Sequence, residues 1–284
     1  MASSCNACPR RCGVARPNGY CGAGEQIKIS HYMRHMWEEP FISGKNGSGA
    51  VFFSGCNLGC VFCQNYKIST LCDGKTVTET ELQEIFDTLC SQGVHNINLV
   101  TPSHYIEQIS AVLRNKKPAV PVVYNCSGYE GDLKLMEGVC DIYLADLKYG
   151  DNAVAGKYSA VNDYVEVCKA SLEEMYRQTG DYVIENGIMQ KGLVVRHLVL
   201  PGNIDNSLDA VDIFASFSKG KKVKFSIMSQ YIPSGRACDF PEINRRLTAE
   251  EYDRVVRYVY KRGITDCLVQ DISSADESFV PDFR

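Results

Sequence analysis

The sequence predicts an α/β fold, a partial (βα)6 barrel of the TIM type with a cysteine-rich segment in front of it. From about residue 50 onward, short apolar runs alternate with longer helix-like stretches, which is typical of strand-helix units around a parallel sheet. Several of these runs are nearly continuous in Val, Ile, Leu, Phe and Tyr, as strands buried on both faces require. The 284 residues, 45% of them hydrophobic, are enough to bury one large core.

Six segments have the composition of barrel strands, and helical patterns fill the gaps between them. The predicted strands are 50–54, 96–100, 121–125, 142–147, 193–200 and 223–228. Thr78, followed by Glu79 and Glu81, predicts a capped helix start. A second helix is predicted to open at 102–105, and helical apolar spacing runs through 208–217 and 248–261.

The ends of the chain do not share this alternation. Residues 1–48 are rich in Cys, Gly, Pro and Arg, and a Gly- and Ser-rich run follows them. We therefore expect a cysteine-rich N-terminal segment over 1–48, the barrel over 49–270, and an acidic surface tail over 271–284.

Charge and hydropathy exclude two classes of partner. The 30 Lys and Arg against 34 Asp and Glu give a net charge of -4, so the chain has no overall basic field to attract nucleic acid. No run approaches the roughly 18 apolar residues of a membrane span, and the start lacks an export signal. We expect a cytoplasmic protein with neither a nucleic acid nor a membrane as partner.

Cysteine is the unusual residue, with 14 in the chain. For a chain without an export signal, thiolate ligation of a metal explains so many cysteines better than a disulfide framework does. Seven of them fall in two tight groups between residues 5 and 63, whereas the others are scattered singly. The clustered cysteines are predicted ligands, and the scattered ones are predicted to pack.

The central group consists of Cys56, Cys60 and Cys63, spaced C-x3-C-x2-C directly after the first predicted strand. A [4Fe-4S] cube has four irons, so three thiolates leave one iron open to a non-protein ligand. The carboxyl end of a strand is also where βα barrels assemble their active sites. The alternative is a zinc site completed by another residue.

With this loop the sequence resembles the radical S-adenosylmethionine (SAM) superfamily, and within it the pyruvate formate-lyase activating enzyme-like iron-sulfur proteins. The likeness covers nearly the whole chain. The motifs that carry it, besides the central loop with Gln64-Asn65, are Cys5-x2-Cys8-Pro9-Arg10-x-Cys12 with 19–22, Glu38-Glu39-Pro40, 100–105, 125–129, 146–149, 196–203 and 228–233.

The resemblance implies an oxidoreductase in which Cys56, Cys60 and Cys63 are the catalytic and metal-binding residues. The open iron would chelate SAM, and the reduced cluster would pass one electron into its sulfonium. The resulting 5'-deoxyadenosyl radical would abstract hydrogen from a substrate such as a glycine of a partner protein. An electron donor such as flavodoxin or ferredoxin is implied as well. A small-molecule or peptide substrate is the first alternative, and a non-catalytic iron-sulfur or zinc protein, acting as electron carrier or scaffold, is the second.

Charged residues at strand ends are the first candidates for binding SAM. By resemblance, Asp146 and Lys148 form a strand-end Asp-x-Lys, whose lysine faces the cofactor carboxylate and whose aspartate helps to hold a monovalent cation. An ordinary charge pair in solvent is the alternative. Arg196 lies in an apolar strand, so its guanidinium must meet either a carboxylate of the cofactor or an internal ion-pair partner.

Polar residues at two other strand ends complete the predicted SAM site. Thr101 and Ser103 stand where many members of the superfamily carry a Gly-Gly-Glu-like element, so hydroxyls and backbone carbonyls would bind the cofactor's amino group here. Asn125 and Ser127 suit ribose hydroxyls or the same amino group, although an Asn-Cys-Ser-Gly turn also forms for purely conformational reasons.

The N-terminal group consists of Cys5, Cys8, Cys12 and Cys21, four thiols in a segment with little else to hold it folded. They suit structural zinc or a second [4Fe-4S] cluster with every iron bound by protein. A second cluster would relay electrons, whereas zinc would only hold the segment together. Free thiols or reversible disulfides are the alternative.

Overall fold

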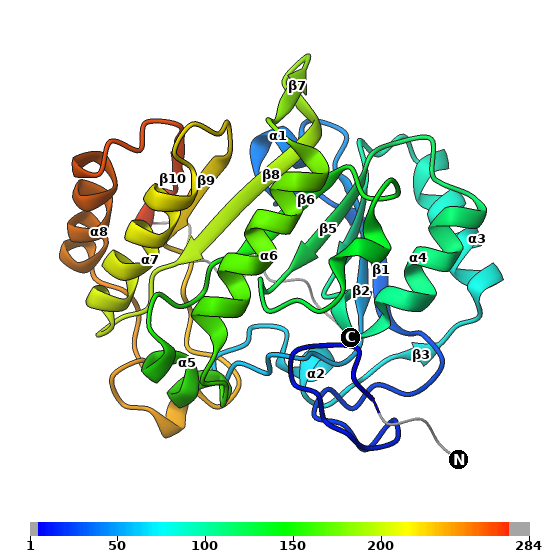
Figure 1. Ribbon diagram of the computed structural model, residues 1–284, viewed down its shortest axis with the longest axis horizontal. Coiled ribbons are helices and arrows are strands. Elements are labelled where there is room, and N and C mark those ends of the chain that lie inside the picture. Colours follow the sequence, from blue (N-terminus) through cyan, green and yellow to red (C-terminus); the bar gives the residue numbers. More distant parts are fainter. Residues whose placement is uncertain (1–4, 273–284) are drawn as a thin grey trace.

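The computed structural model describes residues 5–272, and within that range a ten-stranded sheet forms the centre of the molecule (Figure 1). Its strands are β1 Lys28–His35, β2 Ser48–Phe53, β3 Lys75–Thr76, β4 Ile97–Val100, β5 Val122–Cys126, β6 Ile142–Asp146, β7 Val183–Glu185, β8 Ile188–Leu198, β9 Lys224–Met228 and β10 Cys267–Val269. The sheet order is β10-β9-β8-β6-β5-β4-β2-β1-β3, with β7 paired to β8. The strands from β2 to β10 along this path pair in parallel. The predicted α/β class with a mostly parallel sheet is confirmed.

Helices follow most parallel strands and cover the outer face of the sheet (Figure 1). The helices are α1 Pro40–Ser43, α2 Tyr66–Ser69, α3 Glu79–Ser91, α4 Ile106–Asn115, α5 Asn152–Ser159, α6 Tyr164–Thr179, α7 Ile204–Phe217 and α8 Ala249–Lys261, with short 3-10 turns η1 Ser103–Tyr105, η2 Leu133–Met136 and η3 Ala237–Asp239. Thr78 and Glu81 form the predicted capping box of α3, and α8 begins with the same arrangement. None of the helices within residues 5–272 has the length and apolar character that a membrane crossing needs.

All six predicted strands are present, as β2, β4, β5, β6, β8 and β9. β8 begins five residues before the predicted start, because its first part pairs with β7 in a hairpin. The turn of that hairpin is Asn186-Gly187, both at positive φ, as a two-residue hairpin turn requires. β10 adds a parallel edge strand of only three residues, too short for composition to indicate.

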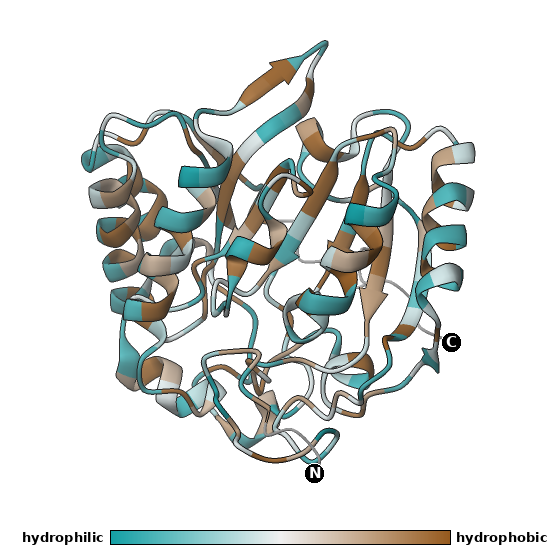
Figure 2. Cartoon of the chain, turned by 45° about the vertical axis from the view of Figure 1, so that its right-hand side comes forward, coloured by the Kyte–Doolittle hydropathy of each residue, from teal (hydrophilic) through white to brown (hydrophobic). Residues whose placement is uncertain are grey.

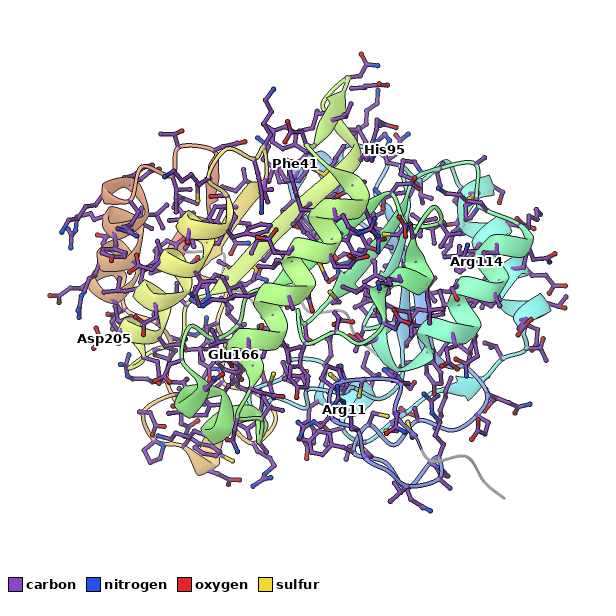
Figure 3. The ribbon with its side chains drawn as sticks, viewed as in Figure 1. Arg11, Phe41, His95, Arg114, Glu166 and Asp205 are labelled. Atoms are coloured by element: carbon purple, nitrogen blue, oxygen red, sulfur yellow. The ribbon has the colours of Figure 1, made fainter. Side chains whose placement is uncertain are left out.

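Strand β1 lies within residues 1–48, yet it belongs to the central sheet. It pairs antiparallel with β2 along most of its length and with β3 at two positions. Residues 5–27 form neither helix nor strand. Figure 1 shows this segment in dark blue beyond the carboxyl ends of the parallel strands, and Arg11 marks it in Figure 3. Of the predicted tail 271–284, residues 273–284 lie outside the described range.

Side chains of the parallel strands alternate between two apolar layers. Residues such as Val122 and Tyr124 pack under the helices, whereas Val123 faces inward. At the amino-terminal end the inward residues surround Phe41 of α1, which closes that end of the partial barrel. Phe41 and His95 lie at this end in Figure 3, and Figure 2 shows the largely hydrophobic strands behind helices with hydrophilic outer surfaces.

Candidate functional site

A cavity of about 390 Å³ opens at the carboxyl ends of the parallel strands. Inward-facing positions near the ends of β2, β4, β5, β6, β8 and β9 all contribute to its wall. Because these positions alternate with those under the helices, a polar side chain there reaches the cavity without entering the apolar layer. The lining residues that bear on the chemistry are Trp37, Glu38, Cys56, Cys60, Cys63, Thr101, Asn125, Ser127, Asp146, Lys148 and Arg196.

The three central cysteines lie in the loop between β2 and α2, and all three line the cavity. Gly55 and Gly59 turn the chain here with φ of 90° and 61°, a conformation that residues with a Cβ rarely adopt. The backbone N–H of Cys63 donates to the carbonyl of Cys60 at 3.1 Å, which closes the second turn of the loop. The spacing predicted from the sequence therefore brings three sulfurs to one wall.

Each of the three sulfurs accepts a hydrogen bond from the protein. Ser159 Oγ lies 3.1 Å from Cys60 Sγ, Ser69 Oγ lies 3.2 Å from Cys63 Sγ, and a backbone N–H donates to Cys56 Sγ at 3.4 Å. Burial, followed by the neighbouring Cys60, raises the pKa of Cys56 to about 12. Burial raises the pKa of Cys63 as well, so Cys56 and Cys63 need a nearby cation to become thiolates.

The arrangement suits a cluster better than a single ion. Within residues 5–272, no three His, Cys, Asp or Glu side chains stand ready to hold one metal ion. Zinc requires its ligands to converge on one point about 2.3 Å from each sulfur. A [4Fe-4S] cube instead gives each thiolate its own iron, so the sulfurs need not converge. The three thiols around one cavity therefore fit a cube with one open iron.

A buried ion-pair network lines the same cavity as the central loop. Arg196 of β8 donates to Asp146 Oδ1 at 2.8 Å, to Glu38 Oε2 at 3.1 Å and to Asn125 Oδ1 at 2.7 Å. Asp146 and Arg196 are direct neighbours in the register of β6 and β8. Lys148 Nζ donates to the second oxygen of Asp146 at 2.5 Å. Of the two alternatives for Arg196, the structure therefore has the internal ion pair.

The network keeps Asp146, Lys148 and Arg196 charged despite burial. Burial would raise the pKa of Asp146, but Arg196 and Lys148 hold it below its usual value. Burial would likewise lower the pKa of Lys148, and Asp146 keeps it raised instead. Burial would also lower the pKa of Arg196, but the nearby carboxylates, Asp146 above all, raise it instead. The cavity wall thus presents fixed charges rather than neutral polar groups.

Two glutamates that the sequence indicated only as part of a motif belong to this network. Glu38 Oε1 accepts hydrogen bonds from Asn98 at 2.9 Å and from Asn125 at 3.1 Å. Glu39 is buried, its Oε2 lies 3.9 Å from Arg196 Nη1, and that oxygen has no hydrogen-bond partner within residues 5–272. The sequence shows only two consecutive acids before Pro40, and no pattern in it indicates that they pair with Arg196.

Most of the predicted SAM-binding residues meet at the cavity. Thr101, Asn125 and Ser127 line it together with the charged network, and Thr101 does so at a φ of 60°. Ser103 is not among the lining residues. The chain turns at Thr101 into η1, which buries Ser103 beside Tyr124 and Glu130, on the side of β5 that faces the helices.

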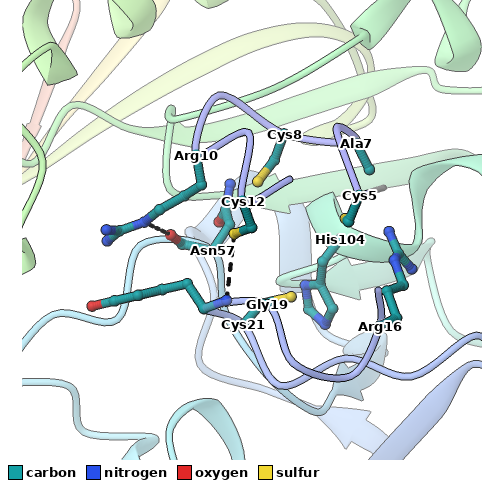
Figure 4. Close-up of a pocket in the computed structure, with 11 residues that line it drawn as sticks. Cys5, Ala7, Cys8, Arg10, Cys12, Arg16, Gly19, Cys21, Asn57 and His104 are labelled. Carbon is teal, nitrogen blue, oxygen red and sulfur yellow. Dashed lines mark hydrogen bonds between the residues drawn. The ribbon is translucent and has the colours of Figure 1, made fainter. Parts of the chain in front are cut away.

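The N-terminal cysteines gather around a second, separate space. Cys5, Cys8, Cys12 and Cys21 line it together with Arg10, Arg16, Asn57 and His104 (Figure 4). None of the fourteen cysteines, all of which fall within residues 5–272, is in a disulfide. The alternative of reversible disulfides is therefore not the state of this structure.

Comparisons with known proteins match the chain to a family and to one relative. The family model of the Radical SAM superfamily matches residues 50–214. The uncharacterized protein MJ0674 of Methanocaldococcus jannaschii is 30% identical over 275 residues, which cover 92% of this chain and 75% of that protein. Among solved structures, methylornithine synthase (PylB) is similar with a TM-score of 0.47 and 13% identity, over 78% of this chain and 70% of that one.

Proposed function

Because the chain belongs to the radical SAM superfamily, whose members use a [4Fe-4S] cluster and SAM, we propose that Cys56, Cys60 and Cys63 hold that cluster. In this superfamily the two cofactors together supply reductive cleavage of SAM to a radical. The observation that carries the proposal is that all three sulfurs line the same cavity as the buried charged network. Three protein ligands leave the fourth iron for SAM.

The charged wall is proposed to orient SAM. Lys148 uses one of its three N–H donors for Asp146, so two donors remain for the cofactor carboxylate. Thr101, Asn125 and Ser127 line the same cavity and are proposed to bind the amino group and ribose. Both oxygens of Asp146 already accept from Lys148 or Arg196, which argues against a monovalent cation at that carboxylate.

For the substrate we favour a glycine of a partner protein, as the resemblance to activating enzymes implies. The glycine would lose one Cα hydrogen atom to the cofactor-derived radical and become a glycyl radical. Trp37 lines the cavity with 62% of its surface exposed, and a protein partner would cover such an aromatic rim. The guanidinium of Arg196 is engaged by the protein's own groups, so it is poorly placed to bind the carboxylate of a small amino acid.

The test of the radical chemistry is 5'-deoxyadenosine formation. The full chain is reconstituted anaerobically with iron and sulfide, reduced with dithionite and given SAM. We expect product from wild type and from Cys238→Ala, which removes an exposed thiol outside the cavity, and none from the Cys56→Ala, Cys60→Ala, Cys63→Ala variant. No product from iron-loaded wild type, even with stronger reductants, would favour the electron carrier or scaffold alternative.

The substrate class is tested by adding either the macromolecular or the small-molecule fraction of a cell extract to the reduced enzyme with SAM. A protein substrate predicts faster 5'-deoxyadenosine formation with the macromolecular fraction, together with a glycyl-radical signal in electron paramagnetic resonance (EPR). Stimulation by the small-molecule fraction alone would instead support a small-molecule substrate.

A further inference from the structure

The N-terminal segment has an ordered structure that its own backbone hardly accounts for. Residues 5–27 form no helix or strand, and their backbone hydrogen bonds are few, such as the pair that joins Cys5 to Gly13 and Val14 and the turn from Gly22 to Gly19. Four thiols nevertheless point into one space at the centre of this loop (Figure 4). A loop of this kind needs a cross-link to stay ordered, and its thiols are not joined as disulfides.

The surroundings of the four sulfurs suit negative charge. Cys8 and Cys21 are buried, and the backbone N–H of Tyr20 donates to Cys12 Sγ at 3.4 Å. Arg16 lines the same space next to Cys5. Four thiolates around a metal centre leave a net negative charge, which guanidinium groups and backbone donors stabilise.

The choice between zinc and a cluster depends on convergence. A structural zinc needs four sulfurs directed at one point, and within residues 5–272 no three His, Cys, Asp or Glu side chains are arranged that way. A cube accepts four sulfurs from four separate corners. The four cysteines therefore suit a fully protein-bound [4Fe-4S] cluster.

The N-terminal space shares a wall with the central cysteine loop. Cys56 lines the main cavity, whereas Asn57, the next residue, lines the N-terminal space. On the other side of Cys56, Gly55 packs so closely on Cys21 that a Cβ would overlap the Cys21 carbonyl oxygen. The two groups of thiols are thus separated by a single turn of backbone.

Arg10 fastens this shared wall. Its guanidinium donates to the carbonyls of Asn57 at 2.7 Å and Leu58 at 2.9 Å, and to those of Ser159 at 2.6 Å and Ala160 at 2.9 Å. The guanidinium also stacks 3.4 Å from the ring centroid of Tyr20. One side chain of the N-terminal segment therefore fixes the segment to the loop that carries Cys56 and Cys60.

We propose that Cys5, Cys8, Cys12 and Cys21 hold a second [4Fe-4S] cluster that passes single electrons to the cluster at Cys56, Cys60 and Cys63. The relay half of this proposal rests on the proposed function, whereas the metal site does not. In each transfer the N-terminal cluster takes one electron from a protein donor of the flavodoxin or ferredoxin class. It then returns to its oxidised state as the central cluster is reduced by one electron.

The position of the segment explains why a relay is useful. The central sulfurs are enclosed between the cavity and the shared wall, and SAM and substrate would fill the cavity. The N-terminal segment lies at the outer edge of the molecule, with Tyr20 and Val14 exposed beside the four cysteines. A protein donor can dock there without blocking the cavity. The electron then passes from the N-terminal cluster to the adjacent central cluster, and such transfer is efficient over short distances.

Metal content tests the site without reference to activity. Iron, sulfide and zinc are measured per chain after anaerobic reconstitution, and EPR spectra are recorded after reduction with dithionite. Two cubes predict about eight irons in wild type and about four in the Cys56→Ala, Cys60→Ala, Cys63→Ala variant, which keeps the N-terminal cysteines. The Cys8→Ala, Cys21→Ala variant should also hold about four, with a different EPR signal, and Cys238→Ala should match wild type.

Each contrary result is decisive. About one zinc and no iron in the Cys56→Ala, Cys60→Ala, Cys63→Ala variant would overturn the cluster in favour of a structural ion. No metal in that variant would overturn the site itself. Because this variant leaves the N-terminal segment intact, misfolding of the Cys8→Ala, Cys21→Ala variant does not affect the conclusion. A wild type that holds two clusters but forms no 5'-deoxyadenosine would contradict the proposed function alone.

The relay is tested by changing the reductant. Dithionite is small enough to reach the central cluster directly, whereas reduced flavodoxin must use a docking surface. The Cys8→Ala, Cys21→Ala variant should keep 5'-deoxyadenosine formation within about twofold of wild type with dithionite, yet lose about tenfold or more with flavodoxin. The comparison is made on preparations of this variant that hold the four irons of the central cluster, and in these either equal loss with both reductants or no loss with flavodoxin would overturn the relay.

Discussion

The two cysteine groups lie on either side of one backbone loop, but different parts of the structure hold them in place. The central loop extends from β2, and its cavity is also lined by a network of fixed charges centred on Asp146 of β6 and Arg196 of β8. The N-terminal group lies in a segment without helix or strand and is fastened largely by one arginine. The first group is positioned by the sheet, whereas the position of the second depends on its attachment to the central loop.

Because of this difference, we expect substitutions near the two groups to change stability in different parts of the molecule. Substitutions in the charged wall should affect the whole domain, because the wall joins several strands of one sheet. Substitutions at the attachment of the N-terminal segment should open that segment and leave the sheet intact.

Replacement of the central guanidinium should have the largest effect. Arg196→Met leaves Glu38, Glu39 and Asp146 close together without their shared cation. Removal of one partner from a buried ion pair typically costs about 3–5 kcal/mol, so the free energy of unfolding should fall by about that amount. Urea unfolding under anaerobic conditions measures it.

The matched control is Arg262→Met, which removes an exposed pair with Asp212 and should cost about 0–1 kcal/mol. Adding Glu38→Gln to Arg196→Met should restore part of the lost stability, because it removes one of the unpaired charges. If Arg196→Met were as mild as its surface control, the charged wall would not be what holds the strand ends together.

Replacement of the attachment should have a smaller and local effect. Arg10→Lys keeps the charge but loses the planar fork that reaches four carbonyls. We expect the opening free energy of the segment to fall by about 2 kcal/mol, since hydrogen bonds from charged groups contribute about 1.5–3 kcal/mol each. Hydrogen exchange at the Gly13 and Gly22 amides should then accelerate by about 30-fold.

Arg11→Lys is the neighbouring control, because Arg11 is exposed. It should leave the exchange of both glycine amides unchanged. Amides of β5 and β6 should exchange at the wild-type rate in both variants. Equal acceleration throughout the sheet in Arg10→Lys would mean that the segment and the barrel unfold as one unit.

The sequence predicted those parts of the molecule that local patterns determine. Strands buried on both faces need runs of apolar residues, so their positions were visible in composition alone. The cysteine groups were visible in spacing, since thiols close in sequence are close in a loop. Asp146 and Lys148 were predicted from the resemblance to a strand-end Asp-x-Lys, and in the structure their side chains meet where β6 ends.

The parts that were missed depend on contacts distant in sequence. Glu38 and Arg196 are 158 residues apart, and only the folded sheet brings them to 3.1 Å. Ser103 was expected at the cavity because it follows a strand end, but the turn at Thr101 directs it toward the helices. The attachment by Arg10 uses backbone carbonyls, which carry no sequence pattern at all.

The last expected effect concerns Glu39, and it depends on pH. Burial raises the pKa of Glu39 to about 7, and the negative charges of Glu38 and Asp146 act in the same direction. The positive charge of Arg196 acts against them. Between the unfolded pKa of about 4.3 and the folded value, the native protein holds a proton that the unfolded chain has released. Glu39 therefore costs stability as the pH rises through this window. Glu39→Gln, which stays neutral, should lose less stability than wild type between pH 5 and pH 8. A difference between the two proteins that does not change with pH would show that Glu39 is already ionised in the folded state at pH 5, with its charge fully compensated by Arg196.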